Sequence, residues 1–486
     1  MKLNELVKDL ELLGGNADLE TEIGGVCYDS RRTQPGDLFV AVRGFETDGH
    51  RYIPAAVAKG AAAVLCEEAP ADGTPYLLIK DCRLGLALTS RAWFGDPAAE
   101  MTVVGFTGTS GKTSSTTVLK HLLEETLGAK VGLIGTNGNM IGDELLHTEH
   151  TTPESYELQK LFRRMKDAGC THVVMEVSSH SLALERVAGV SFDVALFTNL
   201  SQDHLDLHGT MEEYAAAKKK IFSQCRVGCV NLDDERAAYM TEGVSCPIFS
   251  YSALRNDADL TAKDVRLSAS GVRFAAVSGG ELALTRLAIP GMFSVYNALS
   301  VLAAGLCLGI PLADCAAALA TARGVKGRME SVPTDGDYSI IIDYSHKPDA
   351  LEKALKTLRP VTRGRLVVLF GCGGDRDRKK RPLMGAIAEQ NADLTIVTSD
   401  NPRTEEPQAI IDEILTGMKA RRGSVKVIVD RAEAIRWAID NALPGDVILL
   451  AGKGHEDYQV VGKEKHHMDE REIVAEHIER RKHACQ

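Results

Sequence analysis

Continuous runs of apolar residues recur along the chain, and polar or glycine-rich segments separate them. The predicted strands are residues 102–107, 130–134, 171–176, 193–198, 339–343, 366–370, 394–398, 425–429 and 446–450. Several are followed by apolar residues at helical spacing, as in 114–127, where Gly128 marks the helix end. Uninterrupted apolar strands alternating with helices are typical of parallel sheets covered on both faces. The pattern therefore predicts two βαβ arrays.

The first hundred residues have a different pattern. Short apolar pieces at 37–42 and 63–66 alternate with alanine-rich helical pieces, and Phe94-Gly95-Asp96-Pro97 has the composition of a linker. The second βαβ array starts near Gly327. We therefore expect three domains, namely a small mixed α/β domain and two domains with parallel sheets, over residues 1–96, 97–326 and 327–486.

Composition and charge narrow the class of protein. The chain has 486 residues, 25% of them charged, and a formal net charge of −11. Proteins that bind nucleic acid or anionic membranes usually carry the opposite sign, so we expect neither partner. No apolar run approaches the roughly 18 residues of a membrane span, and the N-terminus lacks the apolar core of a signal peptide. We expect a cytoplasmic protein, with its charged C-terminal helix at 469–482 forming only a solvated face.

Cysteine and glycine contents add two expectations. The eleven cysteines are scattered and contain no CxxC pair, which favours reduced, mostly buried thiols over a disulfide or zinc framework. Glycine accounts for 44 residues, whereas aromatic residues make up only 5%. Such a chain favours tight turns and close backbone approach, as folds that handle phosphate do.

The clearest motif is the segment 107–114, Thr-Gly-Thr-Ser-Gly-Lys-Thr-Ser, between a predicted strand and a predicted helix. Backbone N–H groups of a glycine loop and a helix N-terminus can enclose phosphate oxygens, while a lysine adds charge and a hydroxyl can bind Mg²⁺. The spacing reads GxxGKT rather than GxxxxGK[ST], and the alternative is a glycine-rich turn with a solvated lysine. The predicted nucleotide-binding residues are Gly108, Thr109, Ser110, Gly111, Lys112, Thr113 and Ser114.

Polar residues follow the other strands of the first array, where ligands of open parallel sheets bind. Thr151 and Thr152 precede a helix and could simply cap it. Glu176 ends a strand and offers oxygen ligands. The segment 198–209 contains two histidines and two aspartates within six residues, a possible metal site. Carboxylates beside a phosphate loop favour Mg²⁺ over zinc there.

The second array carries three further polar clusters at its strand ends. Residues 371–381 include five basic side chains, residues 400–403 read Asp-Asn-Pro-Arg, and residues 452–456 read Gly-Lys-Gly-His-Glu. A solvated loop or a nucleic-acid contact is the alternative for the basic segment. The acidity of the chain and the strand-end location favour a small anionic or zwitterionic substrate, such as an amino acid.

Taken together, these motifs resemble the Mur ligase family of ATP-dependent ligases, which build the peptide of bacterial cell-wall precursors. The matches extend over nearly the whole chain and include the glycine loop with its short spacing. The further matching segments are 28–31, 35–41, 176–180, 199–204, 214–218, 296–298, 327–330 and 343–346. The resemblance implies a uridine-nucleotide domain, a central P-loop-type ATPase domain and a C-terminal Rossmann-like domain that binds an amino acid.

Within that family, residues 400–403 resemble the signature of members that add meso-diaminopimelate. Lysine-adding members usually lack the arginine, and Arg403 can bind the distal carboxylate that lysine does not have. The resemblance implies ATP and Mg²⁺ as cofactors and UDP-MurNAc-L-Ala-D-Glu as the second substrate. ATP would phosphorylate the γ-carboxylate of D-glutamate, and the amine of diaminopimelate would displace phosphate from the acyl phosphate. We expect a monomer.

The resemblance also implies roles for individual residues. It places Mg²⁺ on Thr113, Glu176, His204 and a carbamylated Lys218, with Lys112 on the phosphates. The implied nucleotide contacts are Asn297, Arg328, Asp343 and His346, although Ser345 and Lys347 depart from the usual motif. The implied contacts to the UDP-sugar dipeptide are Ser30, Thr151, Thr152, Ser178 and Arg186, with Leu184 where many relatives have glutamine. The implied contacts to the amino acid are Arg376, Asp400, Asn401, Arg403, Gly452 and Glu456.

Three other interpretations fit parts of the sequence. Another member of the superfamily, such as a D-Ala-D-Ala-adding ligase or a folylpolyglutamate synthetase, would not need both residues 28–31 and the Asp-Asn-Pro-Arg segment. A P-loop kinase or a GTPase-like switch would not need the second βαβ array. A non-catalytic nucleotide-binding scaffold would not need Glu176, His204 and Lys218 together.

Overall fold

A computed structural model describes residues 1–44, 47–322, 324–418 and 424–484 of the chain. The chain forms two compact units that alternate along the sequence. The first unit comprises Met1–Thr261 and Leu299–Cys315, and the second comprises Ala262–Ala298 and Ala316–Gln486. In the described residues, no helix has the length and apolar character that crossing a membrane requires.

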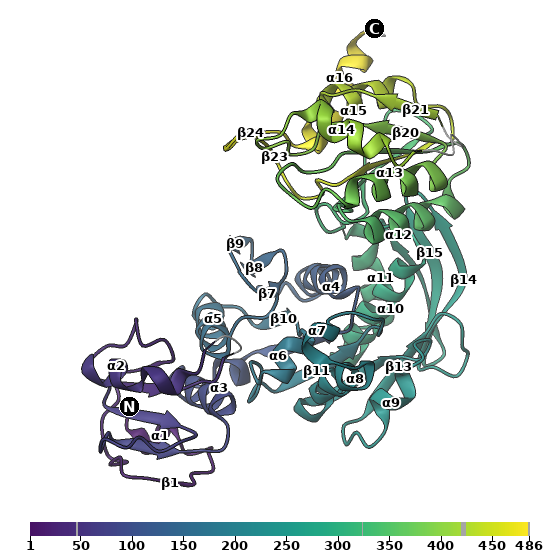
Figure 1. Ribbon diagram of the computed structural model, residues 1–486. Coiled ribbons are helices and arrows are strands. Elements are labelled where there is room, and N and C mark those ends of the chain that lie inside the picture. Colours follow the sequence, from purple (N-terminus) through teal and green to yellow (C-terminus); the bar gives the residue numbers. More distant parts are fainter. Residues whose placement is uncertain (45–46, 323, 419–423, 485–486) are drawn as a thin grey trace. The chain divides into compact units, whose positions relative to one another are not determined.

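The first unit begins with a small five-stranded sheet of order β1-β5-β4-β3-β2, drawn in purple in Figure 1. Its strands are β1 (Gly14–Gly15), β2 (Gly25–Cys27), β3 (Asp37–Val40), β4 (Ala63–Cys66) and β5 (Tyr76–Leu78). Only β1 is antiparallel to its neighbour. The helices beside it are α1 (Leu3–Leu6), η1 (Gly49–Tyr52), α2 (Ile53–Ala58) and α3 (Cys82–Trp93). The predicted strands at 37–42 and 63–66 are thus present, the first two residues shorter.

The rest of the first unit is built on a parallel sheet in the order β13-β12-β11-β6-β10-β7, which β8 and β9 extend as antiparallel strands. The strands are β6 (Thr102–Thr107), β7 (Val131–Gly135), β8 (Gly138–Ile141), β9 (Glu144–Leu146), β10 (His172–Glu176), β11 (Phe192–Phe197), β12 (Cys225–Asn231) and β13 (Ile248–Ser252). The chain leaves β6 toward β7 and later passes from β10 to β11 across β6. Because this reversal of direction opens a crevice beyond the carboxyl end of β6, a ligand site is expected there.

Helices cover both faces of this sheet (Figure 1). They are η2 (Pro97–Glu100), α4 (Lys112–Leu127), α5 (Ser155–Asp167), α6 (Ser179–Ala183), α7 (Leu205–His208), α8 (Met211–Lys219), η3 (Lys220–Gln224) and α9 (Ala237–Thr241). Helix α4 packs on β7 and β10, and α5 buries Leu158, Phe162 and Met165 in a core with Val173 and Met175 of β10. Helix α4 begins at Lys112, two residues before the predicted start.

Two helices connect the units along the chain. Helix α10 (Met292–Cys307) and helix α11 (Leu312–Thr321) each begin in one unit and end in the other. Strand β14 (Leu260–Ser268) does the same, since Leu260 and Thr261 pair with β13. In the second unit β14 continues beside β15 (Gly271–Ser278), which pairs in antiparallel fashion with β16 (Glu281–Leu287). The sequence pattern did not identify these three strands.

The second unit contains a six-stranded sheet of order β17-β18-β22-β19-β20-β21, in which only β17 is antiparallel to its neighbour. Its strands are β17 (Glu330–Val332), β18 (Ser339–Asp343), β19 (Leu366–Phe370), β20 (Leu394–Val397), β21 (Ser424–Val427) and β22 (Val447–Ala451). The other elements are α12 (Pro348–Leu358), η4 (Arg359–Val361), α13 (Lys380–Asn391), α14 (Pro407–Leu415), α15 (Arg431–Asp440), α16 (Glu470–Ala484) and the hairpin β23 (Tyr458–Val461) with β24 (Glu464–His467). All five predicted strands are present, displaced by at most two residues.

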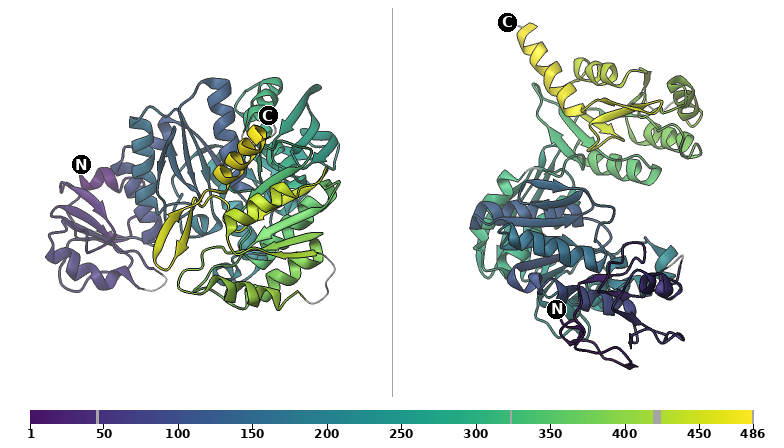
Figure 2. Two further views of the ribbon diagram at one scale, coloured as in Figure 1. Left: turned by 90° about the horizontal axis from the view of Figure 1, so that it is seen from above. Right: turned by 90° about the vertical axis from the view of Figure 1, so that its left-hand side faces the viewer.

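The expectation that the C-terminal helix is only a solvated face is wrong. Helix α16, yellow in Figure 2, packs against α15. It buries Val474 completely and leaves Ile478 6% exposed, and both belong to the core of the six-stranded sheet. At its start, Glu470 is fully buried and accepts a hydrogen bond from Nε of Arg431 (2.8 Å). Charged residues on the other side of the helix conceal this narrow apolar stripe in the sequence.

Candidate active site

The phosphate loop lies where the sequence places it, between the end of β6 and the start of α4. Gly108 adopts φ = 147°, and a Cβ at this position would lie 1.9 Å from Oγ1 of Thr198. A residue with a side chain would fit there only if the loop after the neighbouring strand β11 moved. Helix α4 begins at Lys112 within the loop, and among the described residues no side chain caps its first turn. Because the first backbone N–H groups of a helix have no partner within it, this end of α4 favours anions.

Two lysines converge on the loop. Nζ of Lys112 donates to the carbonyl oxygen of Gly108 (2.7 Å), and Nζ of Lys218 on α8 donates to the same oxygen (2.9 Å). Burial lowers the pKa of Lys112, and burial together with the charge of Lys112 takes the pKa of Lys218 well below its ordinary value. Neither lysine forms an ion pair within the described part of the chain. An anionic group is therefore the ligand that this loop fits best.

Glu176 faces the start of α4 from the end of β10 and is 1% exposed. Its Oε2 accepts from Oγ1 of Thr113 (3.0 Å), and its Oε1 accepts from the backbone N–H of Thr136 (2.9 Å). Burial raises the pKa of this carboxyl above its ordinary value. A buried carboxylate and a hydroxyl are hard oxygen donors, which fit Mg²⁺. The structure thus brings together two of the residues expected to bind the metal.

His204 is placed differently. It precedes α7 with φ = 52°, its side chain is 47% exposed, and its ring meets the ring of His180 edge-on with centroids 4.8 Å apart. Burial lowers the pKa of His180 and of His208, so both imidazoles favour the neutral form. In the part of the chain that the structure describes, no group of three or more His, Cys, Asp or Glu side chains is arranged to hold a metal. The two histidines and two aspartates of 198–209 do not form such a group.

The loop after β11 supports the phosphate loop, a role that the sequence did not indicate. Oδ1 of Asn199 accepts from the backbone N–H of Ser110 (3.0 Å), and its carbonyl oxygen accepts from the N–H of Thr109 (2.9 Å). The hydroxyl of Tyr214 lies 3.1 Å from Oγ1 of Thr109. The segments 199–204 and 214–218 both stood out in the sequence, but only the fold shows that they contact the loop.

The residues expected to contact the dipeptide gather at the carboxyl end of β10. Oγ1 of Thr152 donates to the carbonyl oxygen of Glu176 (2.8 Å) and accepts from the N–H of Ser178 (3.2 Å). Nη1 of Arg186 donates to the carbonyl oxygen of Thr152 (3.3 Å). Thr151 contacts Thr136 through their hydroxyls (3.0 Å). Thr152 therefore links a strand end to the next loop and does not cap α5, whose N-cap is Glu154.

The first sheet contributes a separate surface of the same unit. Ser30 follows β2 and is 9% exposed. Close by in the sequence, the hydroxyl of Tyr28 donates to Oε2 of Glu157 on α5 (2.8 Å). A cavity of about 520 Å³ is lined by Tyr28, Arg32 and the loop 146–150, among others. This cavity has the size of a ligand pocket.

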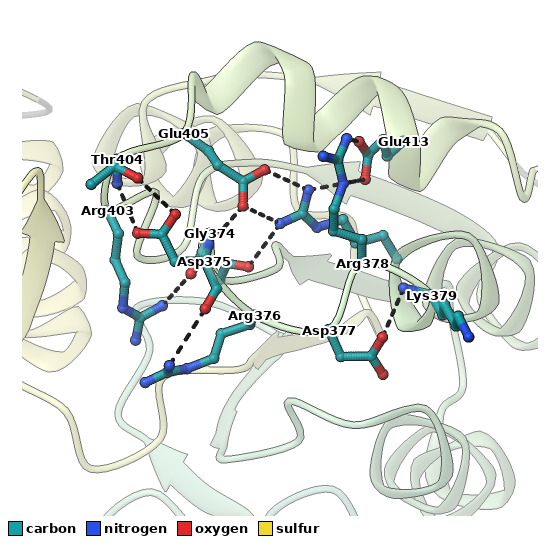
Figure 3. Close-up of polar contacts among 12 residues, drawn as sticks. Gly374, Asp375, Arg376, Asp377, Arg378, Lys379, Arg403, Thr404, Glu405 and Glu413 are labelled. Carbon is teal, nitrogen blue, oxygen red and sulfur yellow. Dashed lines mark hydrogen bonds and ion pairs between the residues drawn. The ribbon is translucent and has the colours of Figure 1, made fainter.

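The second unit has a larger cavity of about 1030 Å³, which collects all the residues predicted to contact the amino acid. These are Arg376, Asp400, Asn401, Arg403, Gly452 and Glu456. They meet because their loops follow β19, β20 and β22, which are neighbours in the sheet. Figure 3 shows Arg376 and Arg403 on adjacent loops. These six residues offer two guanidinium groups, two carboxylates and an amide, a set suited to a zwitterion with a further carboxylate. The lining also includes Asp349, Asp377 and four lysines.

Lys453 is fully buried and contacts Asn401 and Glu456, two residues that line this cavity. Its Nζ donates to Oδ1 of Asn401 (3.0 Å), and Nδ2 of Asn401 donates to Oε2 of Glu456 (2.9 Å). Because an ammonium can only donate, Lys453 fixes which end of the Asn401 amide faces Glu456. Within the segment 452–456, the sequence pointed to Gly452 and Glu456 as contacts but not to Lys453.

The expected nucleotide contacts outside the phosphate loop also lie in the second unit. The Arg328 guanidinium lies over the ring of Tyr344, 5.3 Å from its centre. Asp343 ends β18, accepts from the N–H of Met329 (2.8 Å) and also contacts the hydroxyl of Ser345. Burial raises the pKa of Asp343. His346 lines the 1030 Å³ cavity, and Asn297 lies on α10, 5% exposed. Ser345, which departs from the family's motif, thus contacts the carboxylate directly.

Comparisons with known proteins match this chain over nearly its whole length. Residues 22–93 match the model "Mur ligase family, catalytic domain", residues 106–305 match "Mur ligase middle domain", and residues 327–454 match "Mur ligase, glutamate ligase domain".

The curated relatives include UDP-N-acetylmuramoyl-L-alanyl-D-glutamate–2,6-diaminopimelate ligases. The one from Clostridioides difficile is 44% identical over 98% of this chain and 99% of its own length. The one from Caldanaerobacter subterraneus is 46% identical over 98% of each. A solved structure of a ligase with the same name has a TM-score of 0.81 at 32% identity and covers 99% of both chains. The predicted α/β architecture of three domains is confirmed by this likeness.

Proposed function

The chain belongs to the Mur ligase family, and on this premise we propose that it adds meso-2,6-diaminopimelate to UDP-MurNAc-L-Ala-D-Glu. The γ-carboxylate of D-glutamate takes the γ-phosphoryl group of ATP, which releases ADP. The amine of diaminopimelate then forms an amide bond with the acyl phosphate and expels inorganic phosphate. The observation that carries the assignment is the cavity that collects Arg376, Arg403, Asn401 and Glu456.

The difficult part of this reaction is the attack of one anion on another. Lys112 and the N-terminus of α4 supply positive charge that is fixed before the substrate arrives. Preorganised charge of this kind stabilises the transition state because the protein need not reorganise during the reaction. Thr113 and Glu176 would hold Mg²⁺, with His204 near a second ion. When bound, Mg²⁺ neutralises charge that develops on the phosphates.

We assign a carbamate to Lys218 as part of this proposal. Its burial and its neighbour Lys112 favour the neutral amine, and a neutral amine is the form that reacts with CO₂. A new N–C bond forms, one proton leaves, and the side chain becomes an anion with two oxygens suited to Mg²⁺. Incubation with ¹³C-labelled bicarbonate tests the assignment. A ¹³C carbamate resonance is expected in the wild type and not in Lys218→Ala, and its absence from both would contradict it.

The remaining assignments follow the same premise. Arg186, Thr151, Thr152 and Ser178 contact the muramoyl dipeptide, and Ser30 contacts the uridine part. Asn297, Arg328, Asp343 and His346 serve the nucleotide. The Arg403 guanidinium binds the distal carboxylate of diaminopimelate, while Asp400, Asn401 and Glu456 bind its amino-acid end with Arg376 and Gly452. The proposal also includes three domains, with the limits 1–96, 97–326 and 327–486. It further includes a monomeric state and a location in the cytoplasm, where ATP and UDP-sugars occur.

Phosphate release tests the function directly. With ATP, Mg²⁺ and UDP-MurNAc-L-Ala-D-Glu, the protein should release phosphate only when diaminopimelate is added, and mass spectrometry should detect the tripeptide product. Arg403→Met should raise KM for diaminopimelate about 10- to 100-fold, since a bond between charged groups is worth about 1.5–3 kcal/mol. No release with diaminopimelate would overturn the function. Equal efficiency with L-lysine would overturn only the selectivity.

A further inference from the structure

One arginine of the basic segment 371–381 differs from the others. Arg381, in the first turn of α13, is fully buried, whereas the side chain of Arg378 is 67% exposed. Nη1 of Arg381 donates to Oε2 of Glu405 and to Oε2 of Glu413, each at 2.9 Å. Nη2 donates to Oε1 of Glu405 (2.8 Å) and to the carbonyl oxygen of Gly373 (3.2 Å). A planar guanidinium can make these contacts at once, and an ammonium cannot.

These contacts join two of the loops that line the amino-acid cavity. Gly373 belongs to the loop after β19, which carries Arg376, and Glu405 belongs to the loop after β20, which carries Arg403. Further bonds cross between the loops around this centre. Glu405 accepts from the N–H of Asp375 (2.6 Å), and Asp375 accepts from the hydroxyl of Thr404 (2.7 Å). Figure 3 shows Thr404 and Glu405 directed toward Asp375.

The backbone of both loops needs such support. Asp375 and Arg403 adopt left-handed conformations, with φ of 53° and 52°, which non-glycine residues adopt only at a cost. The loops also approach closely, since a Cβ on Gly374 would lie 1.8 Å from the carbonyl oxygen of Pro402. Arg403 spans the gap by donating from Nη1 to the carbonyl oxygen of Gly374 (2.8 Å). Small movements of either loop would therefore change where Arg403 presents its guanidinium.

We propose that Arg381 is a positioning residue for amino-acid selectivity. It does not line the cavity, but it holds the loops of Arg376 and Arg403 in the arrangement that binds a distal carboxylate. The inference rests on the proposed function, because it concerns the same cavity. A buried ion pair adds little net stability compared with apolar packing, so fixed geometry is the property that this arrangement is suited to provide.

Steady-state kinetics of Arg381→Lys tests the inference. The lysine keeps the charge but loses the two-pronged contact with Glu405. We expect KM for diaminopimelate to rise at least tenfold, while KM for ATP and KM for the UDP-dipeptide change less than twofold. A purely structural role would lower the active fraction, and hence the apparent kcat, without this selective rise in one KM.

Two further variants keep the test decisive. Arg378→Lys is the matched control, because Arg378 binds Glu413 from the solvent side and has no hydrogen bond to Glu405. It should leave every KM within twofold. Thr404→Val removes only the hydroxyl bond to Asp375 and should raise KM for diaminopimelate about threefold. It decides the question if Arg381→Lys does not fold, as judged by thermal unfolding.

The outcomes separate the two proposals. A wild type that releases no phosphate with diaminopimelate would overturn the proposed function and this inference with it. An active wild type with an unchanged KM for diaminopimelate in Arg381→Lys would overturn the inference alone. The same holds if Arg378→Lys raises that KM as much as Arg381→Lys does, or if Arg381→Lys does not fold and Thr404→Val leaves it unchanged.

Discussion

In the described part of the chain, two lysines and one glutamate lie at the phosphate loop without an oppositely charged side chain in contact. Lys112 and Lys218 share one carbonyl oxygen and have no carboxylate within ion-pair distance among the described residues. Glu176 is buried with only hydroxyl and backbone donors in contact. Burial disfavours the charged form in each case, which the pKa directions of all three express. A phosphate anion bound at Lys112 and a metal cation bound at Glu176 would supply the missing opposite charges.

Replacement of Glu176 by glutamine tests this arrangement. The amide has nearly the same shape but cannot balance a cation, so we expect kcat to fall by about 10²- to 10³-fold. The wild type should need more Mg²⁺ as pH falls, because protonation of Glu176 competes with the metal. Burial raises the pKa of this carboxyl, so the effect should begin at a higher pH than it would for an exposed glutamate.

Mg²⁺ activation curves between pH 5 and pH 8 measure this effect. The matched control is Glu124→Gln, at the opposite end of α4, where Glu124 pairs with Lys120. It should leave both kcat and the Mg²⁺ requirement unchanged. A Glu176→Gln enzyme with wild-type kcat and an ordinary Mg²⁺ requirement would contradict the role given to Glu176.

At the residue scale, the sequence was sufficient to identify sites whose residues are adjacent in the chain. It was not sufficient to identify residues whose role depends on their burial in the fold. The order Gly108, Gly111, Lys112, Thr113 specifies a phosphate loop by itself, because all its parts are adjacent in the chain. Arg381 looks like its basic neighbours in the sequence, and only the fold makes it the buried one. Likewise, the contact of Asn199 with Ser110 spans 89 positions, which no local pattern can reveal.

At the scale of elements, strands buried on both faces were predictable, whereas the run β12–β16 was not identified. Strands such as β6, β18 and β19 are buried on both faces, so their apolar runs are continuous. Strand β16 alternates exposed and buried residues, with Leu282 and Leu284 exposed, and its pattern is therefore weaker. Helix α16 was misjudged because two buried apolar residues among many charges give a faint signal.

The burial of α16 has a measurable consequence. Ile478→Ala should lower the free energy of unfolding by about 2–5 kcal/mol, since it leaves a cavity in the core of the second unit. Trp437 packs against the same core and reports its unfolding by fluorescence. A Trp93→Phe background removes the signal of the chain's other tryptophan.

Glu479→Ala, on the exposed side of α16, is the control and should change the free energy by no more than about 0.5 kcal/mol. If both variants unfold like the parent protein in denaturant titrations, α16 does not contribute to the core and the original expectation of a solvated helix returns.

At the scale of the whole molecule, the net charge and the local clusters of charge indicate different properties of the partners. The chain carries −11, yet its proposed substrates are themselves anions. Positive charge must then be concentrated where it is needed, as it is at Lys112 and Arg186 in one unit and at Arg376 and Arg403 in the other. The net charge argues against nucleic acid as a partner, and only the local clusters indicate phosphates and carboxylates.

The thiols of the whole chain can be tested together. Ten cysteines lie in described residues and all are free, while Cys485 lies outside the described residues. Burial raises the pKa of Cys66 to about 11 and that of Cys315 and Cys372 to about 12, so they hold almost no thiolate at pH 8. The buried thiols are Cys66, Cys82, Cys170, Cys229, Cys315 and Cys372.

Alkylation of the native protein with N-ethylmaleimide at pH 8 should leave these six thiols unmodified, and denaturation should make them reactive. Peptide mass spectrometry identifies each site. Without reductant, the intact mass should equal that of the fully reduced chain. A mass lower by two hydrogens, or rapid labelling of Cys315 or Cys372, would contradict the reduced and buried thiols described above.

The alternation of the two units along the chain affects how the protein is made. The chain passes from one unit to the other after Thr261, after Ala298 and again after Cys315. During synthesis the first unit cannot be completed until residues 299–315 have left the ribosome, by which time a segment of the second unit already precedes them. That segment, 262–298, must wait for the rest of its own unit. No single cut in the chain or the gene separates the two units as intact pieces.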